Sequence, residues 1–287
     1  MQRLRIRHVT EYRFAGPVTL NPHRLLLRPR EGHDVRIESS RLDISPGYHI
    51  QWYRDVFDNS LAIVRFHQSA ATLSILSEVV IQHYADAPLP FAVAEYALNY
   101  PFAYPESERM DLAAFQQPVF SQDQPAVHQW LRDLGLLNGP IQTDVLESRL
   151  NQIIHTQFRY QAREEAGVQS PAQTLMKGSG SCRDYATLFI EACRCLGLAS
   201  RFVSGYLHAP ATELGNGATH AWAEVYLPGY GWQGFDPTVG ELTHKRHIAV
   251  AVARNPQAVP PVAGSFIGPT CNRPNMIVDV QVNLMDA

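Results

Sequence analysis

Lysine is nearly absent from this chain of 287 residues, which contains only Lys177 and Lys245, so arginine carries almost all of the basic charge. The protein therefore has few amine groups through which it could be crosslinked to itself. Its formal net charge of −3 gives no reason to expect nucleic acid or a membrane as the main partner. Arg3, Arg5 and Arg7 form a row, but acidic residues occur in the same region. We interpret the row as the charged solvent face of a half-buried strand.

Long apolar runs are missing as well. The chain has no run of about eighteen apolar residues, the length that a membrane-spanning helix needs. Residues 1–9 alternate charged with apolar side chains, where a signal peptide would need a continuous apolar segment. The sequence therefore predicts a cytoplasmic protein.

The few cysteines do not have the spacing of a zinc site or of a secreted disulfide framework, which fits a reducing compartment. The four are Cys182, Cys193, Cys195 and Cys271. We predict no metal ion and no other cofactor. Cys193 and Cys195 follow the body of a predicted helix and are interpreted as core residues.

The order of the predicted elements indicates an α+β protein. Residues 1–85 are rich in short alternating runs separated by turn residues, which predicts a β-sandwich-like domain. Residues 86–122 mix prolines with aromatic residues and are predicted to be a linker on the surface. Residues 123–287 are predicted to form a second domain in which helices near 124–134, 144–157 and 178–197 precede antiparallel strands, with a C-terminal β extension.

Cys182 is the first candidate for chemistry. It follows a glycine-rich turn and lies at the start of an amphipathic segment that ends near Gly197. Unpaired backbone N–H groups and the positive end of the helix dipole favour a thiolate at such a position. The alternative, a cysteine that is only a small core residue, fits poorly with glycine and polar neighbours.

His220 and Asp236 are the candidates for a base and for the group that orients it. His220 opens the run 219–226, and Asp236 closes the run 231–236. A three-residue hairpin loop, Pro228 to Tyr230, would place Trp222 opposite Asp236 and His220 on the same face, one diagonal away. A loop of even length would separate the two side chains onto opposite faces. The backbone N–H of Cys182 would be the first oxyanion donor.

Four motifs resemble the core of the transglutaminase-like superfamily, in its bacterial cysteine-protease-like branch. They are Gly-Ser-Cys-Arg-Asp at 180–184, Ala-Ser-Arg-Phe-Val-Ser-Gly-Tyr at 199–206, Thr-His-Ala-Trp-Ala-Glu-Val-Tyr at 219–226 and Gly-Trp-Gln-Gly-Phe-Asp-Pro-Thr at 231–238. The resemblance spans about residues 144–238, and the β-rich start is similar to the domain that often precedes this core in bacteria. It implies a papain-like fold in which the cysteine helix packs on a sheet, with Cys182, His220 and Asp236 as nucleophile, base and orienting acid.

The sequence departs from the animal members of this family. They use an upstream tryptophan as a second oxyanion donor, and no tryptophan lies between Leu131 and Cys182 here. Tyr160, Gln169 and Gln173 are possible substitutes that the sequence does not rank. Tyr160, Gln169 and Trp222 are also our candidates for substrate binding. No acidic loop resembles a calcium site.

The expected activity is attack by Cys182 on a peptide or protein carboxamide, followed by transfer of the acyl group to water. Transfer to an amine by the same triad is the first alternative, and a catalytically silent peptide-binding module is the second. A metal cage of Cys182, His220 and His208 is disfavoured. His208, His244 and His247 lack ligand spacing and are interpreted as surface or loop residues. The sequence leaves the oligomeric state open.

Overall fold

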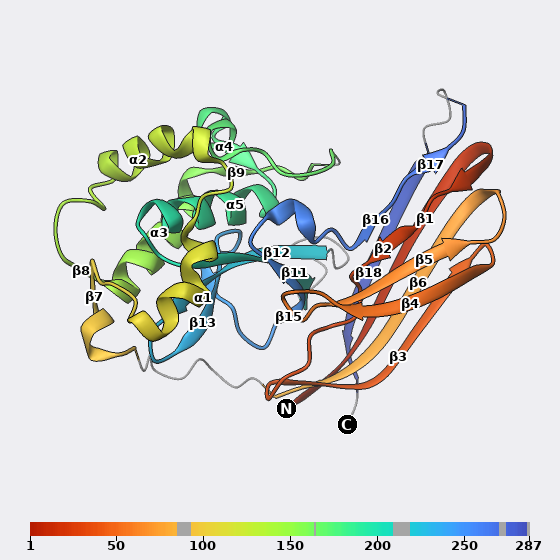
Figure 1. Cartoon of the computed structure of the whole chain (residues 1–287), viewed down its shortest axis with the longest axis horizontal. Helices are drawn as coiled ribbons and strands as arrows, with labels where there is room; N and C mark the ends of the chain where they lie inside the picture. Colours follow the sequence, from red (N-terminus) through yellow and green to blue (C-terminus); the bar gives the residue numbers. More distant parts are fainter. Residues whose placement is uncertain (85–92, 164, 209–218, 270–273, 286–287) are drawn as a thin grey trace.

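The computed structural model describes residues 1–84, 93–163, 165–208, 219–269 and 274–285. Long strands form one end of the molecule, and the helices gather at the other end around a second sheet (Figure 1). The α+β class predicted from the sequence is confirmed.

Two antiparallel sheets build the strand-rich end. The first runs in the order β17-β1-β6-β3, with β18 also paired to β1, and the second runs β16-β2-β5-β4. Their apolar faces enclose a core that includes Val18, Leu25, Val64 and Ile75. The strands are β1 (Gln2–Leu20), β2 (His23–Leu25), β3 (Val35–Ser45), β4 (Tyr48–Arg54), β5 (Ser60–Phe66), β6 (Ala70–His83), β16 (Val262–Ala263), β17 (Phe266–Ile267) and β18 (Asn275–Leu284).

The end of the chain returns to this first region. Strand β18 pairs with β1 from Leu4↔Leu284 to Arg13↔Asn275. The alternation of residues 276–284 predicted this strand, but the sequence grouped it with the second domain. Its hydrogen-bonded neighbour is a strand of the N-terminal β domain, the name used here for residues 1–84.

Residues 93–122 are more structured than a linker. They contain η1 (Glu95–Ala97), β7 (Asn99–Tyr100), α1 (Glu106–Gln116) and η2 (Ser121–Asp123). Helix α1 buries only Leu112, so it has no apolar stripe that would reveal it in the sequence. Contacts with α5 (Cys182–Cys195) and with the turn after it fix the end of α1, because Arg194 donates to the Phe115 carbonyl and Gln116 donates to the Gly197 carbonyl.

The second domain packs helices on a five-stranded antiparallel sheet in the order β14-β13-β12-β11-β15. Helix α5 lies on β12 and β11 and buries its apolar stripe, including Tyr185, Leu188 and Phe189. The helices are α2 (Gln124–Asp133), α3 (Thr143–Gln157), α4 (Pro171–Lys177), α5 (Cys182–Cys195) and η3 (Pro256–Ala258). The strands are β8 (Ile141–Gln142), β9 (Arg159–Tyr160), β10 (Ser179–Gly180), β11 (Ser200–Leu207), β12 (Thr219–Leu227), β13 (Gly231–Asp236), β14 (Glu241–Leu242) and β15 (His247–Ala253).

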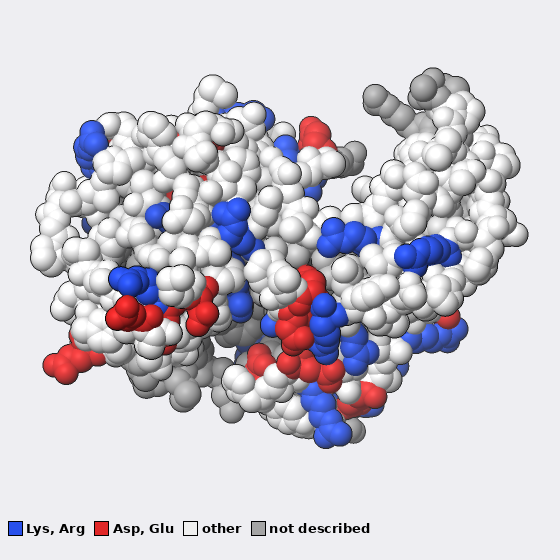
Figure 2. Space-filling model, in the orientation of Figure 1, with Lys and Arg blue, Asp and Glu red and all other residues white. Residues whose placement is uncertain are grey.

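The surface mixes charges of both signs. Basic and acidic side chains lie beside one another across the lower middle of the face in Figure 2. Arg3 pairs with Glu38 at 2.8 Å, and Arg7 pairs with Asp279 at 3.0 Å, so two arginines of the row on β1 have acidic partners. Across the residues that the structure describes, no helix is long and apolar enough to cross a membrane.

Candidate active site

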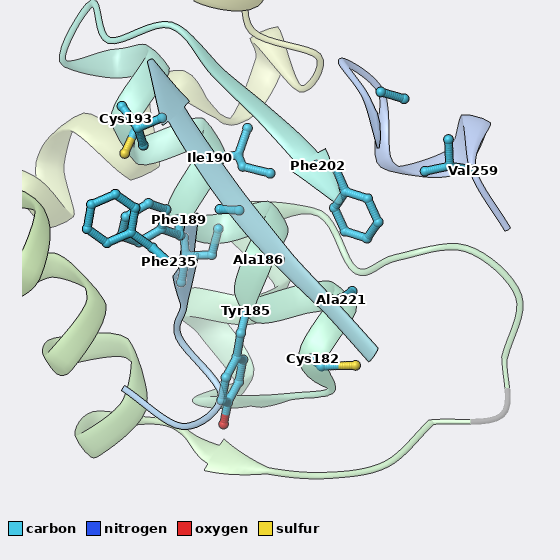
Figure 3. Close-up of a cluster of buried hydrophobic side chains, with 14 of the residues drawn as sticks. Cys182, Tyr185, Ala186, Phe189, Ile190, Cys193, Phe202, Ala221, Phe235 and Val259 are labelled. Atoms are coloured by element: carbon cyan, nitrogen blue, oxygen red, sulfur yellow. The ribbon is translucent and has the colours of Figure 1, made fainter. Parts of the chain in front are cut away.

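Cys182 is the first residue of α5, as the sequence predicts. Helix α4 ends at Lys177, and its C-cap is Gly178, whose φ of 60° lies in the left-handed region that favours glycine. Ser179 and Gly180 then form the short strand β10, and Ser181 is the N-cap of α5. In Figure 3 the Cys182 side chain lies at the end of its helix near Ala221, while Cys193 lies farther along the same helix.

Asp184 fixes the turn that carries the cysteine. Its buried carboxylate accepts from the backbone N–H and the hydroxyl of Ser181, at 2.8 and 2.9 Å, and from the Gln169 backbone N–H at 2.6 Å. Arg163 Nε lies 2.9 Å from the same carboxylate. A Cβ at Gly180 would come within 2.8 Å of the Asp184 Cβ, so the turn requires glycine there. These contacts hold the turn that precedes Cys182 in one conformation.

The hairpin of β12 and β13 has the predicted register. Its pairs run from Ala223↔Phe235 to Leu227↔Gly231, which leaves a three-residue loop at 228–230. The same register places Trp222 opposite Asp236. His220 Nε2 lies 2.6 Å from Asp236 Oδ2, and both side chains are buried.

His220 is held as an imidazolium beside the cysteine. Burial alone would lower its pKa, but the charge and hydrogen bond of Asp236, followed by those of Cys182, outweigh burial and raise the pKa to about 10. Because Nε2 is bonded to Asp236, Nδ1 is the ring atom that remains for the thiol. The arrangement can deprotonate a thiol and keep the resulting positive charge next to it.

Asp236 is fully hydrogen-bonded. Thr238 N–H donates to its Oδ1 at 2.9 Å, and both His220 and His247 contact its Oδ2. Burial would raise the pKa of this carboxyl, but the charges and hydrogen bonds of the two histidines hold it well below its usual range. It is therefore an ionised acceptor and not an acid.

His247 was expected on the surface or in a loop, and that prediction is wrong. It is 6% exposed, and its Nε2 lies 3.0 Å from Asp236 Oδ2. The cause is a β-bulge. Ser204 pairs with Ala251 but Gly205 pairs with Ala249, so Val250 is an extra residue that reverses the alternation of β15. His247 consequently shares a face with Val252 and Trp222, although simple alternation would put it on the other face.

His220, Asp236 and His247 are also the one group among the described residues whose side chains could together hold a metal ion. Their possible ligand atoms all lie within 4.8 Å of one another. Their geometry is that of hydrogen bonds. Two ligands of a tetrahedral zinc ion at about 2.0–2.1 Å lie about 3.3 Å apart, whereas His220 Nε2 and Asp236 Oδ2 are 2.6 Å apart. The cage of Cys182, His220 and His208 considered from the sequence is not a group of this kind within the described ranges.

The three predicted substrate-binding residues have different surroundings. Trp222 is 2% exposed. Its ring packs edge-on against that of His247, with ring centroids 5.3 Å apart, and so contacts a residue that binds Asp236. Gln169 is 3% exposed, and its amide donates to the Ser179 carbonyl and to Asp184. Both are therefore buried framework residues, although Gln169 also borders a polar cavity beside the cysteine turn.

Tyr160 is the predicted residue that remains exposed near the cysteine. It pairs with Gly180, next to the N-cap of α5, and is 45% exposed. Burial of its hydroxyl, the charge of Cys182 and the charge of Tyr185 raise its pKa to about 12. Gln173, the third possible oxyanion donor, is engaged in the N-terminal capping box of α4.

The other cysteines lie apart from this chemistry. Cys193 is fully buried, as expected of a core residue, and Cys195 is half-buried. Burial raises the pKa of both thiols. Cys271 lies outside the described residues.

A polar cavity of about 410 Å³ adjoins the cysteine turn. Gln161, Arg163, Lys177 and Gly180 are among the residues that line it. Gln161 also donates its backbone N–H to the Gly180 carbonyl at 2.8 Å, which joins the cavity wall to the turn. The cavity offers polar groups of both signs beside Cys182.

Two protein-family models match this chain, one over the helix-containing second domain and one over the N-terminal β domain. A model of the transglutaminase-like superfamily matches residues 143–237, and a model of the bacterial transglutaminase-like N-terminal region matches residues 4–82. An uncharacterized protein of Mycobacterium tuberculosis is 29% identical over 297 residues, which cover 99% of this chain and 92% of the relative. One of Mycobacterium leprae is 24% identical, with 98% and 99% covered.

The crystal structure of a putative cysteine protease from Cytophaga hutchinsonii has the same fold. It superposes with a TM-score of 0.77 at 16% sequence identity, and the alignment covers 100% of this chain and 91% of that one. The similarity therefore extends over both sheet regions.

Proposed function

We propose that this chain, which belongs to the transglutaminase-like superfamily by its core and its bacterial N-terminal region, hydrolyses peptide or carboxamide bonds through Cys182, His220 and Asp236. The observation that carries the proposal is the position of His220. Its Nε2 is bonded to Asp236 at 2.6 Å, and its pKa is raised by both Asp236 and Cys182. We refer to Cys182, His220 and Asp236 as the candidate triad.

Before the first half-reaction, the Cys182 proton has already passed to His220 Nδ1, as the raised pKa of His220 favours, and in that half-reaction the sulfur attacks the substrate carbonyl carbon. The C–S bond forms as the carbonyl π electrons move to oxygen. When the tetrahedral intermediate collapses, the C–N bond breaks, and the imidazolium of His220 protonates the leaving amine. Asp236 accepts from Nε2 throughout and stabilises the imidazolium. The product is a thioester on Cys182 and a free amine.

Two donors are proposed for the oxyanion. The backbone N–H of Cys182 lies at the start of α5, where it has no partner within the helix. The hydroxyl of Tyr160 is the second, because Tyr160 is exposed and pairs with Gly180 beside the cysteine turn. The Gln169 amide already donates to the Ser179 carbonyl and to Asp184, and the Gln173 side chain is held at Ser170 by the capping box of α4. With its pKa raised to about 12, Tyr160 remains a neutral donor at working pH.

In the second half-reaction, water gives a proton to neutral His220 and attacks the thioester, and the acid and the free thiol are released. A primary amine could replace water and would give a new amide. Hydrolysis is the simpler outcome, because transfer to an amine needs a second channel that admits the amine and keeps water out.

The test is a peptide–carboxamide library incubated with the protein, with and without a primary amine, together with iodoacetamide titration of Cys182. Free acid that forms without the amine supports hydrolysis, and amide that forms only with the amine supports transfer. The Cys182→Ala variant must lose either activity, whereas Cys195→Ala, which alters a half-buried thiol away from the candidate triad, must keep it. Binding of peptides without product, with Cys182 alkylating no faster than a free thiol, would identify a silent binding module instead.

A further inference from the structure

Strand β15 connects the N-terminal β domain to the candidate triad. It is the last strand of its sheet, with β11 on one side. Residues of the N-terminal β domain bind the backbone of β15 and of the loop just before it, on either side of His247. His83 Nδ1 lies 2.9 Å from the Lys245 carbonyl, and the Arg30 N–H donates to the Ala249 carbonyl at 2.8 Å. The edge of the core sheet is therefore completed by the first domain.

Asn59 makes the most specific of these contacts. Its side-chain amide makes the two backbone hydrogen bonds that a neighbouring strand would make. Oδ1 accepts from Val252 N–H at 2.9 Å, and Nδ2 donates to the Val252 carbonyl at 2.8 Å. Asn59 is fully buried, and it is held in turn by Asp55 and Arg30. A buried side chain with its amide satisfied in this way fixes the position of the strand that it binds.

His247 links β15 to Asp236 through a hydrogen bond. The backbone N–H of His244 points at His247 Nδ1 at 3.3 Å, so Nδ1 is the acceptor and Nε2 carries the proton. The Nε2–H group therefore donates to Asp236 Oδ2 at 3.0 Å. The titratable groups that face His247 are Asp236 on β13, His220 on β12 and His244 in the preceding loop.

The local sequence is adapted to this contact. A Cβ at Gly205 would lie 2.3 Å from the Ile248 carbonyl oxygen and 2.5 Å from the Trp222 ring, so glycine at the bulge lets Trp222 lie against His247. Asp236 and His247 come from strands separated by β12 and β11, a distance of about 14 Å in a flat sheet. The sheet must curl to bring them together, and β15 is the edge that has to be held in the curled position.

We infer that the N-terminal β domain is part of the active-site framework: it fixes β15, and His247 on that strand acts as a positioning residue that holds Asp236 for His220. The inference rests on the proposed function, because it assigns Asp236 to the triad. It gives the first domain a role in the chemistry without requiring that domain to touch substrate.

The experiment compares His247→Phe with His247→Gln in the full chain. Phenylalanine keeps the ring packing on Trp222 but has no donor, whereas glutamine can place an N–H near the position of Nε2. We expect His247→Phe to slow Cys182 alkylation at neutral pH about 10-fold and to lower kcat with KM unchanged, and we expect His247→Gln to restore most of the loss. A His220 titration followed by NMR should move down by at least about one pH unit in His247→Phe and stay near the wild-type value in His247→Gln.

The link through β15 is tested with Asn59→Ala. This change should reproduce part of the loss, and the double variant with His247→Phe should lose less than the sum of the two, because both act on one element. Asn21→Ala is the matched control, since Asn21 bonds the Ser265 hydroxyl and does not contact β15. Additive effects, or a His247→Phe variant with the wild-type alkylation rate and His220 titration, would overturn the inference.

The two levels of the proposal fail in different ways. If the proposed activity is wrong, wild-type Cys182 reacts like an ordinary thiol. The His220 titration still reports whether His247 positions Asp236, because it depends on neither substrate nor thiol reactivity.

Discussion

His220 and Asp236 lie on neighbouring strands with 2.6 Å between Nε2 and Oδ2, and the parity of one hairpin loop puts them on the same face. The loop has three residues, and with this length Ala223 lies opposite Phe235. The next pair in the same register is Trp222 and Asp236, so His220, two residues before Trp222, is on the same face as Asp236. One residue more or fewer in the loop would turn Asp236 to the other face of the sheet. The relation between base and carboxylate is thus set by local chain geometry.

We expect Asp236→Asn to change how stability depends on pH. The pKa of His220 is about 10 in the folded protein, above its ordinary value of 6.5. The stabilisation from this raised pKa is fully present below pH 6.5 and is lost as pH rises towards 10. Asp236, whose folded pKa is depressed, stays ionised over this window and adds no slope. The stability advantage of wild type over Asp236→Asn should therefore shrink between pH 6.5 and 10, by up to about 1.4 kcal/mol per pH unit.

Urea unfolding at pH 6, 8 and 10 measures this difference. Asp43→Asn is the control, because Asp43 pairs with Arg41 on the surface and should give a constant difference. A constant difference for Asp236→Asn as well would contradict the raised pKa of His220.

The residues of the candidate triad could be predicted from the sequence because each is marked by a pattern among residues close to it in the chain. Cys182 was identified by a helix start, and His220 and Asp236 by two runs joined by a short turn. His247 was missed because its orientation depends on the extra residue Val250, which an alternating run does not reveal. Gly205, which lies inside a run that alternates like a strand, is a hint of a bulge in the sequence.

Burial was harder to predict than pairing. Trp222 and Gln169 were both expected near substrate, since an indole and an amide suit that role. Whether such a side chain faces a cleft or the framework depends on distant residues. Trp222 is covered by Val203 and Val252, and the Gln169 amide is bound by Asp184 even though Gln169 borders the polar cavity. Helix α1 was missed for a similar reason, because it depends on its contacts with α5.

The Tyr160→Phe variant should lower kcat by about 10- to 1000-fold with little change in KM, if its hydroxyl stabilises the oxyanion only in the transition state. Tyr185→Phe provides a matched control. The Tyr185 hydroxyl is buried and has no hydrogen-bond partner among the described residues, so its removal should leave activity unchanged. Equal activity of the Tyr160→Phe variant and wild type, measured by amide hydrolysis, would exclude Tyr160 as the second donor.

Glu147 should destabilise the fold increasingly as pH rises. It is fully buried in α3, neither carboxyl oxygen has a partner among the described residues, and burial raises its pKa well above the ordinary value. A carboxyl whose folded pKa is raised stabilises most at low pH, and the contribution is lost as pH rises above 4.5. Glu147→Gln has no such loss, so its stability relative to wild type should grow by up to about 1.4 kcal/mol per pH unit.

Unfolding of both proteins at pH 5, 6, 7 and 8 gives this slope. Glu78→Gln, a change in a partly buried glutamate on β6 of the other domain, is the reference. A stability difference between the Glu147→Gln variant and wild type that does not change with pH would show that Glu147 is not held in its neutral form.

The buried pair of Glu191 and Arg194 should be far more costly to break than a surface pair. Their side chains are almost completely buried, with Arg194 Nη1 lying 2.6 Å from Glu191 Oε1. Glu191 also accepts from the backbone N–H groups of Val119 and Phe120, and Arg194 donates to the carbonyls of Ser200 and Arg254. The pair thereby ties the segment before α2 and the end of β15 to the cysteine helix.

Arg194→Met leaves the Glu191 charge buried without its partner, so we expect a loss of about 3–5 kcal/mol in the free energy of unfolding. Adding Glu191→Gln removes the stranded charge while keeping an acceptor for one backbone N–H, so the double variant should be more stable than Arg194→Met alone. Arg41→Met, which breaks an exposed pair with Asp43, should cost at most about 1 kcal/mol. If the double variant were less stable than Arg194→Met, the loss would come from the missing hydrogen bonds of Arg194 and not from an unpaired charge, and a double-mutant cycle measured by urea unfolding separates the two.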